Sequence, residues 1–192
     1  MPNIFRAVGN FFLDVIETVV IALSIFLIIY LTLVQPHQVN GQSMVPNFQS
    51  GEYVLTDKIS YRFRNPVQGE VVVFHAPEAA HCPNGTGCDF IKRVIAVPGD
   101  TISLTNNHYV VNGTALSESY IPADFQTLAG AYIKDRTITL NEDEYFVSGD
   151  NRPYSSDSRA WGPISKSAIV GRAFFRYWPP GAMGMINKAT YN

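Results

Sequence analysis

One uninterrupted apolar stretch near the start of the chain limits the possible folds more than any other feature. It runs from Val15 to Val34, and Glu17 is its only charged residue. As a helix that rises about 1.5 Å per residue, it reaches about 30 Å, the thickness of the hydrocarbon core of a bilayer. The sequence therefore predicts a short flank over residues 1–14, one transmembrane helix over residues 15–34, and an extramembrane body over residues 35–192.

A cleaved secretory leader is the alternative interpretation of this stretch. Such a leader has a positively charged start, a shorter apolar run and a small-x-small cleavage site. Here the run is long, Arg6 is the only positive charge before it, and no such site follows Val34. We therefore expect a retained anchor that ends at Gln35–Pro36, since proline disfavours helical geometry in the residue before it. Arg6 is positively charged, but Asp14 and Glu17 nearby are negatively charged. The positive-inside rule therefore gives no clear orientation for this helix.

The rest of the chain has the patterns of strands and turns. Short runs of β-branched and aromatic residues alternate with turn-forming Asn, Gly and Pro, and no long amphipathic helix appears. The expected strands are Glu52–Ile59, Glu70–His75, Asp89–Val97, Thr101–Leu104, His108–Val111, Ile133–Leu140 and Ile169–Trp178. Regular structure is expected to end at Pro179. The sequence predicts a mainly β fold, with a small β insertion at about residues 101–141.

Composition narrows the functional classes. A chain of 192 residues can build one domain with a real core. Its formal net charge of −2 provides no broad basic field for nucleic acid. The 4 histidines are scattered, and neither a zinc-type Cys/His spacing nor a phosphate-binding glycine loop is present. We expect a monomer that binds no nucleic acid and uses neither a metal nor another cofactor.

The 2 cysteines, Cys82 and Cys88, enclose residues 83–87, which have turn-forming composition. A disulfide in an oxidising compartment is one interpretation, and two free thiols in a cytosolic loop are the other. The pair is too small for a tetrahedral zinc site without distant histidines.

A serine lies in a glycine- and proline-containing loop soon after the apolar stretch. In the segment GQSMVPNF, Gly41 lets the backbone approach a ligand closely and Pro46 fixes φ just beyond Ser43. Ser43 is a candidate nucleophile. A serine in such a loop more often serves only the turn, so the nucleophile interpretation requires a base elsewhere.

The strand expected at Asp89–Val97 carries two adjacent cations, Lys92 and Arg93. Alternate residues of a strand share a face, which places Lys92 with Val94 and Ala96. Both faces are largely apolar, so each charge must be paired, reach solvent or lose its proton. Lysine can lose its proton and arginine cannot, which makes Lys92 the candidate base. A surface lysine on an edge strand is the alternative.

The segment Gly149–Arg159 is unusually polar. Asp150, Arg152, Asp157 and Arg159 offer opposite charges that could satisfy one another if they were buried. The segment is either a solvated loop, which its composition favours, or the polar wall of a site.

Taken together, these blocks resemble the type I signal peptidases, membrane-anchored serine/lysine proteases that remove leader peptides from exported proteins. The resemblance is carried by the anchor followed in order by GQSMVPNF, GEYVLTDKISY, DFIKRVIAVPGD and GDNRPYSSDSRAWG. Four blocks in register are far more specific than any one of them. They favour the functional interpretations of Ser43 and Lys92.

The resemblance implies a serine endopeptidase that cleaves N-terminal signal peptides from exported preproteins after small-x-small motifs. Ser43 is then the nucleophile and Lys92 the general base of a Ser/Lys dyad. The resemblance also implies that the Ser155 hydroxyl orients the lysine, and that Asp157 and Arg159 brace the wall behind it.

Oxyanion and substrate contacts follow from the same resemblance. The backbone N–H of Ser43 is the expected oxyanion donor. Some family members add a serine hydroxyl two residues before the nucleophile; this chain has Gly41 there, so the second donor stays open. The substrate is expected to add as a strand, with its small side chains in shallow pockets, although core packing is the alternative for each lining residue. The expected lining residues are Val39, Met44, Phe48, Phe90 and Ile91.

The implied partners are signal-peptide-bearing preproteins and the lipid bilayer. The implied location is the plasma or inner membrane, with a single span and an extracytoplasmic catalytic domain. Self-cleaving repressor proteases also use a Ser/Lys dyad, but they are cytosolic and bind DNA. The apolar anchor and the net negative charge of this chain argue against that class. A membrane-tethered β-domain that binds peptides without cutting them is disfavoured by the presence of both Ser43 and Lys92.

Overall fold

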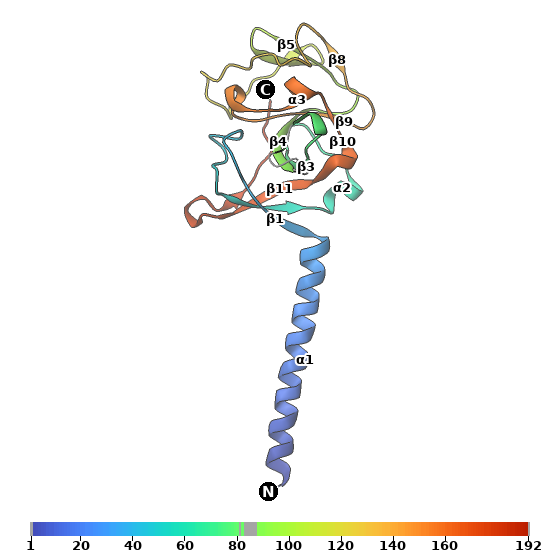
Figure 1. Cartoon of the computed structure of the whole chain (residues 1–192), viewed down its shortest axis with the longest axis vertical. Coiled ribbons are helices and arrows are strands. Elements are labelled where there is room, and N and C mark those ends of the chain that lie inside the picture. The colour runs from blue at the N-terminus through green and yellow to red at the C-terminus, as the bar shows by residue number, and fades with distance from the viewer. Residues whose placement is uncertain (1, 81, 83–87, 192) are drawn as a thin grey trace.

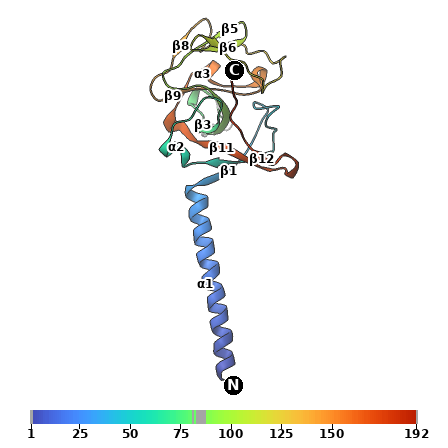
Figure 2. The same cartoon turned by 180° about the vertical axis from the view of Figure 1, so that it is seen from behind.

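The computed structural model describes residues 2–80, 82 and 88–191, and it consists of one long helix and a β-rich body (Figure 1). Helix α1 spans Pro2–Thr32. Its segment Arg6–Tyr30 has a mean hydropathy of 2.5 and is not buried against the body, so it is long and apolar enough to cross a membrane. The N-terminus lies at the far end of α1 and the C-terminus on the body (Figure 2).

The ends of α1 differ from those expected at Val15 and Val34. No proline interrupts residues 6–14, so the helix continues through them. At the other end Val34 pairs with Asp57 as the first residue of strand β1 (Val34–Gln38), which removes it from the helix. Pro36 therefore lies in an edge strand, where its missing N–H costs no ladder hydrogen bond.

The main sheet is antiparallel and has the strand order β1-β2-β11-β3-β4-β9-β10, with β12 added to β11. Its further strands are β2 (Tyr53–Asp57), β3 (Val71–His75), β4 (Asp89–Ala96), β9 (Glu144–Ser148), β10 (Ile164–Ser165), β11 (Ile169–Trp178) and β12 (Gly184–Met185). The mainly β fold is thereby confirmed. The expectation that regular structure ends at Pro179 is wrong, because the chain turns back and β12 pairs with Phe175 and Arg176 of β11.

A smaller sheet is inserted between β4 and β9, and it lies at the end of the body away from α1 (Figure 1). It contains β5 (Thr101–Thr105), β6 (His108–Val111), β7 (Thr114–Ala115) and β8 (Ile138–Thr139). The strand expected at Ile133–Leu140 is reduced to β8. The cause is local, since Asp135 has a φ of 55°, which ends the extended backbone.

The other helical segments are short. They are α2 (Ser60–Phe63), α3 (Ser158–Trp161), η1 (Glu78–Ala80), η3 (Arg152–Tyr154), η4 (Lys166–Ala168) and η5 (Pro180–Ala182).

Strand β4 is held in the core by packing on both faces. Val94 belongs to a buried cluster with Phe74 of β3, whereas Ile95 belongs to a second cluster that joins the main sheet to the insertion. Ala96 packs with Ile95 instead of sharing the face of Val94, because the β4–β9 register shifts between Val94 and Ala96. The strand that carries Lys92 is thus a rigid element.

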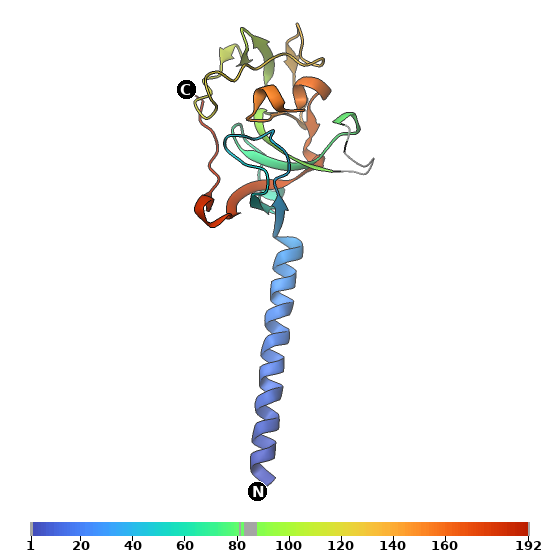
Figure 3. The ribbon, with the colours of Figure 1, turned by 60° about the vertical axis from the view of Figure 1, so that its left-hand side comes forward.

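A disulfide closes the β3–β4 hairpin. Cys82 and Cys88 are joined with an S–S distance of 2.07 Å, and the Ala76 N–H donates to the Cys88 carbonyl at 2.8 Å. Residues 83–87, expected to form a turn, lie outside the described part of the chain. The loop that follows β1 lies beside this hairpin (Figure 3).

Candidate active site

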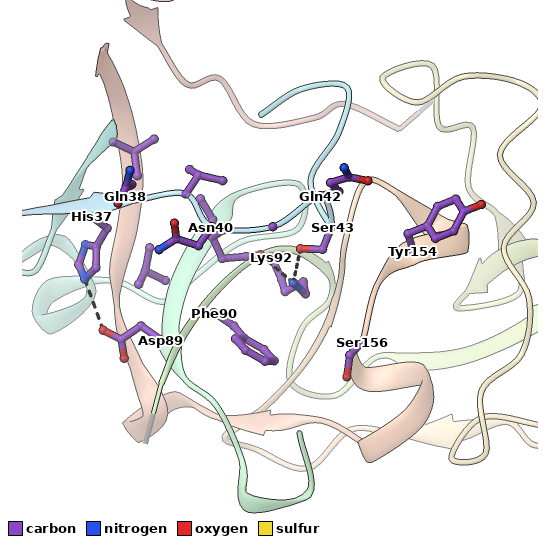
Figure 4. Close-up of a pocket in the computed structure, with 15 residues that line it drawn as sticks. His37, Gln38, Asn40, Gln42, Ser43, Asp89, Phe90, Lys92, Tyr154 and Ser156 are labelled. Atoms are coloured by element: carbon purple, nitrogen blue, oxygen red, sulfur yellow. Dashed lines mark hydrogen bonds and ion pairs between the residues drawn. The ribbon is translucent and has the colours of Figure 1, made fainter. Parts of the chain in front are cut away.

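The structure brings together Ser43 and Lys92, which are 49 residues apart in the sequence. Ser43 lies in the loop Val39–Phe48, here named the serine loop, and Lys92 projects from β4 (Figure 4). Lys92 Nζ donates to Ser43 Oγ at 2.7 Å and to the Ile91 carbonyl at 3.1 Å. A lysine amine at this distance can remove the proton of a serine hydroxyl once the amine is neutral.

Burial favours the neutral form of Lys92. The residue is 4% exposed, and its Nζ lies 5.0 Å from the centre of the Phe90 ring. Desolvation lowers the pKa of Lys92 to about 8, against the opposing charges of Asp157 and Asp150. Among the described residues, no carboxylate lies within ion-pair distance of Nζ. Lys92 is therefore a cation without a direct counter-ion.

The backbone amide of the nucleophile itself is available in the serine loop. Gly41 has a φ of 93°, which favours glycine, and its N–H donates to Ser50 Oγ at 3.2 Å. That bond occupies the Gly41 amide. The N–H of Ser43 has no acceptor among the residues that the structure describes. Ser43 is thus the position at which this loop offers a free amide next to the reactive hydroxyl.

A cleft opens beside Ser43 and Lys92 (Figure 4). Residues of β1 and of the serine loop line one side of it, and residues of β4 line the other. Three of the five residues expected to contact substrate line the cleft: Val39, Phe90 and Ile91. Met44 and Phe48 do not. Their side chains are only 1% and 3% exposed, and they point from the serine loop into the core, where they pack with Val54 and Val71. Val39 belongs to the same buried cluster, but it also lines the cleft.

Two strand edges border the cleft without a strand partner in the described structure. Strand β1 pairs only with β2. Strand β4 pairs with β3 from Asp89 to Arg93 and with β9 only from Arg93 onward, which leaves one edge of residues 89–92 open. Backbone groups on such edges can pair with an added strand. The cleft can therefore accept an extended peptide next to the dyad.

The polar segment Gly149–Arg159 forms a wall whose charged side chains are buried, although Pro153, Tyr154 and Ser156 are exposed. Its charged side chains form ion pairs, each with a shortest distance of 2.7 Å: Asp150 with Arg93, Arg152 with Glu118, and Asp157 with Arg159. Composition favoured the solvated loop because the sequence does not show Glu118 and Arg93 as partners. Once paired, these charges can be buried.

Asp157 organises the part of the wall closest to Lys92. Its carboxylate accepts hydrogen bonds from Ser148 Oγ, the Gly149 N–H and the Arg159 guanidinium. Burial alone would raise the pKa of Asp157, but the hydrogen bonds and charge of Arg159 outweigh it and the pKa is lowered. Asp157 is therefore a carboxylate held ionised and already paired.

Ser155 lies at the same wall but makes no hydrogen bond to Lys92. Its Oγ is buried and has no hydrogen-bond partner among the described residues. It is close enough to Asp157 to help lower the pKa of that carboxyl, although it lies outside hydrogen-bond geometry. A Cβ at Gly149 would collide with Ser155 Oγ and with the Ser43 carbonyl, so the glycine allows the wall to approach the serine loop.

The sequence matches the family model of signal peptidase, peptidase S26, over residues 12–178. The chain belongs to the signal peptidase family. Probable signal peptidase I-2 of Synechocystis sp. is 34% identical over 177 residues, covering 92% of this chain and 78% of the relative. Signal peptidase IB of Staphylococcus aureus is 35% identical over 179 residues, covering 87% and 90%.

A solved structure of signal peptidase I from Enterococcus faecalis V583 also matches, with a TM-score of 0.46 and 26% identity, covering 57% of this chain and 97% of that one. Membership of this family makes the protein a hydrolase of the serine protease type. With its apolar N-terminal helix, it also suggests a membrane-anchored protein.

Several residues of this site could not be predicted from the sequence. Glu118 comes from the insertion and pairs with Arg152 across 34 residues, a contact that no local pattern announces. Gly149 and Asn151 contact the serine loop, and only their position beside Asp150 in the polar segment could have drawn attention to them. These contacts depend on the fold and not on the local sequence.

Proposed function

We propose that this signal peptidase is a membrane-anchored serine endopeptidase that uses a Ser43/Lys92 dyad to remove signal peptides from exported preproteins. The observation that carries the proposal is the 2.7 Å hydrogen bond from the buried Lys92 Nζ to Ser43 Oγ. A lysine with its pKa lowered to about 8 is partly neutral at mildly alkaline pH, as a general base must be.

The reaction then follows acyl transfer. Neutral Lys92 accepts the proton of Ser43 Oγ as this oxygen attacks the scissile carbonyl carbon, and the Ser43 N–H donates to the oxyanion. The Lys92 ammonium gives the proton to the leaving amine, which departs with the mature protein and leaves an acyl-enzyme. Water attacks the acyl carbon while Lys92 takes one of its protons. That proton returns to Ser43 Oγ as the signal peptide is released.

The polar wall has a positioning part in this proposal. Ser155 Oγ is buried and makes no hydrogen bond to any residue that the structure describes, so it is available to orient the Lys92 amine when substrate is bound. Asp157 and Arg159 neutralise each other, which braces the wall without giving Lys92 a counter-ion.

The substrate is proposed to be the end of a signal peptide in an extended conformation, added between the open edges of β1 and β4. Val39, Phe90 and Ile91 then contact its side chains. The shallow site favours small residues, alanine above all, at positions −1 and −3 from the cut. Efficient cleavage after leucine or phenylalanine in a series of peptides would contradict this specificity.

We propose that α1 spans the plasma or inner membrane once, with the β-rich body on the extracytoplasmic side and the protein monomeric. The disulfide supports this orientation, because such bonds persist in oxidising compartments. Protease added to right-side-out vesicles should digest the body beyond Pro36. Complete protection of the body would reverse the orientation.

The decisive experiment incubates the full chain in detergent with an exported preprotein and identifies the cut by mass spectrometry. We expect one cut behind a small-x-small motif, and no cut with Ser43→Ala. Binding of the preprotein without any cleavage by the unmodified chain would replace the protease with a peptide-binding protein.

A further inference from the structure

Asn151 is tied to the serine loop by two hydrogen bonds, and both end on carbonyl groups beside the nucleophile. Its Nδ2 donates to the Gln42 carbonyl at 2.9 Å. Its backbone N–H donates to the Ser43 carbonyl at 3.0 Å. Asn151 is 4% exposed, so water hardly competes for these bonds.

The Gln42 carbonyl and the Ser43 N–H belong to the same peptide group. That peptide is trans, because Val45–Pro46 is the cis bond recorded in this loop. In a planar trans peptide the C=O and the N–H point in opposite directions. Asn151 therefore holds one end of the group whose other end is the free amide beside Ser43 Oγ. The Val45 N–H also donates to the Gln42 carbonyl, at 3.2 Å, so the turn and the side chain act on the same oxygen.

We infer that Asn151 is a positioning residue for the oxyanion, because its side-chain amide directs and polarises the Ser43 N–H through the Gln42–Ser43 peptide. This inference rests on the proposed function. A hydrogen bond accepted by a peptide carbonyl strengthens donation by the N–H of that same group. The Gly41 amide already donates to Ser50 Oγ, so it is not a free donor for the oxyanion, and the orientation of the Ser43 amide matters more.

The unused half of the Asn151 side chain supports a functional role. Its Oδ1 is buried and has no hydrogen-bond partner among the described residues. An unpaired buried oxygen destabilises the folded state. The side chain thus makes one hydrogen bond, the donation to the Gln42 carbonyl, and leaves its buried oxygen unpaired. Packing alone does not explain why an asparagine is placed there.

The test compares Asn151→Ala and Asn151→Asp with the unmodified full chain in detergent. The ionised aspartate has the same shape but cannot donate to Gln42. We expect kcat to fall about 10- to 100-fold in both variants, less than the loss of an oxyanion donor, because the N–H is misdirected and not removed. Affinity for an uncleaved substrate peptide, measured in the Ser43→Ala background, should change by less than about 2-fold.

A peptide aldehyde gives a second readout, since it forms a tetrahedral adduct with Ser43 Oγ whose oxygen occupies the oxyanion position. Its affinity should fall by the same factor as kcat/KM in the Asn151 variants. Unchanged aldehyde affinity, or a loss of peptide affinity that matches the loss of kcat, would overturn the inference.

Asn47→Ala is the matched control. Asn47 also ties the serine loop to the wall, since its Nδ2 donates to Asp150 Oδ2 and to the Tyr120 carbonyl, both at 2.9 Å, but it does not touch the Gln42–Ser43 peptide. We expect kcat to stay within about 3-fold of the unmodified chain. An equal loss in both asparagine variants would assign the effect to loop stability and overturn the inference. If the unmodified chain cleaves and Asn151→Ala matches it, the inference fails alone; if the unmodified chain does not cleave, the proposed function fails first.

Discussion

Lys92 and Arg93 are neighbours on β4, but their side chains lie in opposite electrostatic settings. Both residues are 4% exposed. Arg93 donates to the two carboxylate oxygens of Asp150 at 2.8 and 2.7 Å, and its pKa is raised because this pairing outweighs burial. Within the described part of the chain, Lys92 donates only to Ser43 Oγ and a backbone carbonyl, and burial lowers its pKa to about 8.

The difference teaches that burial alone does not decide the charge of these two side chains. Desolvation disfavours both cations, and a paired carboxylate reverses the outcome for Arg93. The two carboxylates whose charges act on Lys92 are each committed to an arginine, Asp150 to Arg93 and Asp157 to Arg159. Each carboxylate is thus paired with an arginine and gives the lysine no direct partner, and a neutral amine becomes accessible.

The strongest way to break this contrast is to change Lys92 itself. Lys92→Met removes the base, and Lys92→Arg places on the same face a cation that cannot release its proton. Both should lower kcat by about 10⁴-fold, equivalent to about 5 kcal/mol, as should Ser43→Ala. Initial rates on a preprotein measure the loss, and circular dichroism checks the fold. Substantial turnover by any folded variant of the three would remove the dyad mechanism.

Removing the counter-ion tests the other side of the contrast. Asp150→Asn leaves Arg93 buried without its carboxylate, which should lower the free energy of unfolding by about 4 kcal/mol. Urea denaturation of the protein in mild detergent measures the change. Asp124→Asn is the control, because Asp124 is exposed and should alter stability by less than about 0.5 kcal/mol. A similarly small loss for Asp150→Asn would mean that Arg93 does not depend on this partner.

The pH dependence of Lys92 follows from its lowered pKa. Below pH 8 the rate constant kcat/KM should rise about tenfold per pH unit and then level off. A rising limb near pH 6.5 that vanished on replacing one of the 4 histidines would transfer the base role.

Stability should respond to the same group. The folded pKa of about 8 lies below 10.5, the ordinary pKa of a lysine, which applies in the unfolded chain. Between these values the unfolded state binds more protons, so this contribution to stability increases as pH rises from 8 to 10.5. At pH 7 the buried lysine costs about 3 kcal/mol, at about 1.4 kcal/mol per pKa unit. Lys92→Met should therefore gain up to that amount in urea denaturation, with the gain shrinking above pH 8. A gain that does not change with pH would exclude titration of Lys92 as its cause.

The sequence could predict what local patterns determine. β-branched runs located β2, β3, β4 and β11, and four ordered blocks pointed to Ser43 and Lys92, which the structure brings together. The inward orientation of Met44 and Phe48 could not be predicted, because a loop has no periodicity to show which side faces the core.

Contacts made by the tertiary fold were also out of reach. The ion pair of Arg152 with Glu118 depends on where the insertion folds back over the wall. The face of Ala96 depends on a register shift between two strands, which the alternation of one strand does not record.

The smallest expected effect comes from removing the disulfide, and it tests whether residues 89–92 of β4 are less firmly held than Arg93. The disulfide precedes residues 89–92, which have one open edge, whereas Arg93 is paired with β3 on one side and with β9 on the other. Replacing Cys82 and Cys88 by serine should lower the free energy of unfolding by about 2 kcal/mol, because the bond closes only a short loop. Amide exchange should accelerate at Phe90–Lys92 and stay slow at Arg93, while kcat and its apparent pKa are retained. Equal acceleration on both parts of β4 would show that the strand moves as one unit. Loss of all activity in a folded, disulfide-free protein would show that the open part of β4 must be fastened for Lys92 to reach Ser43.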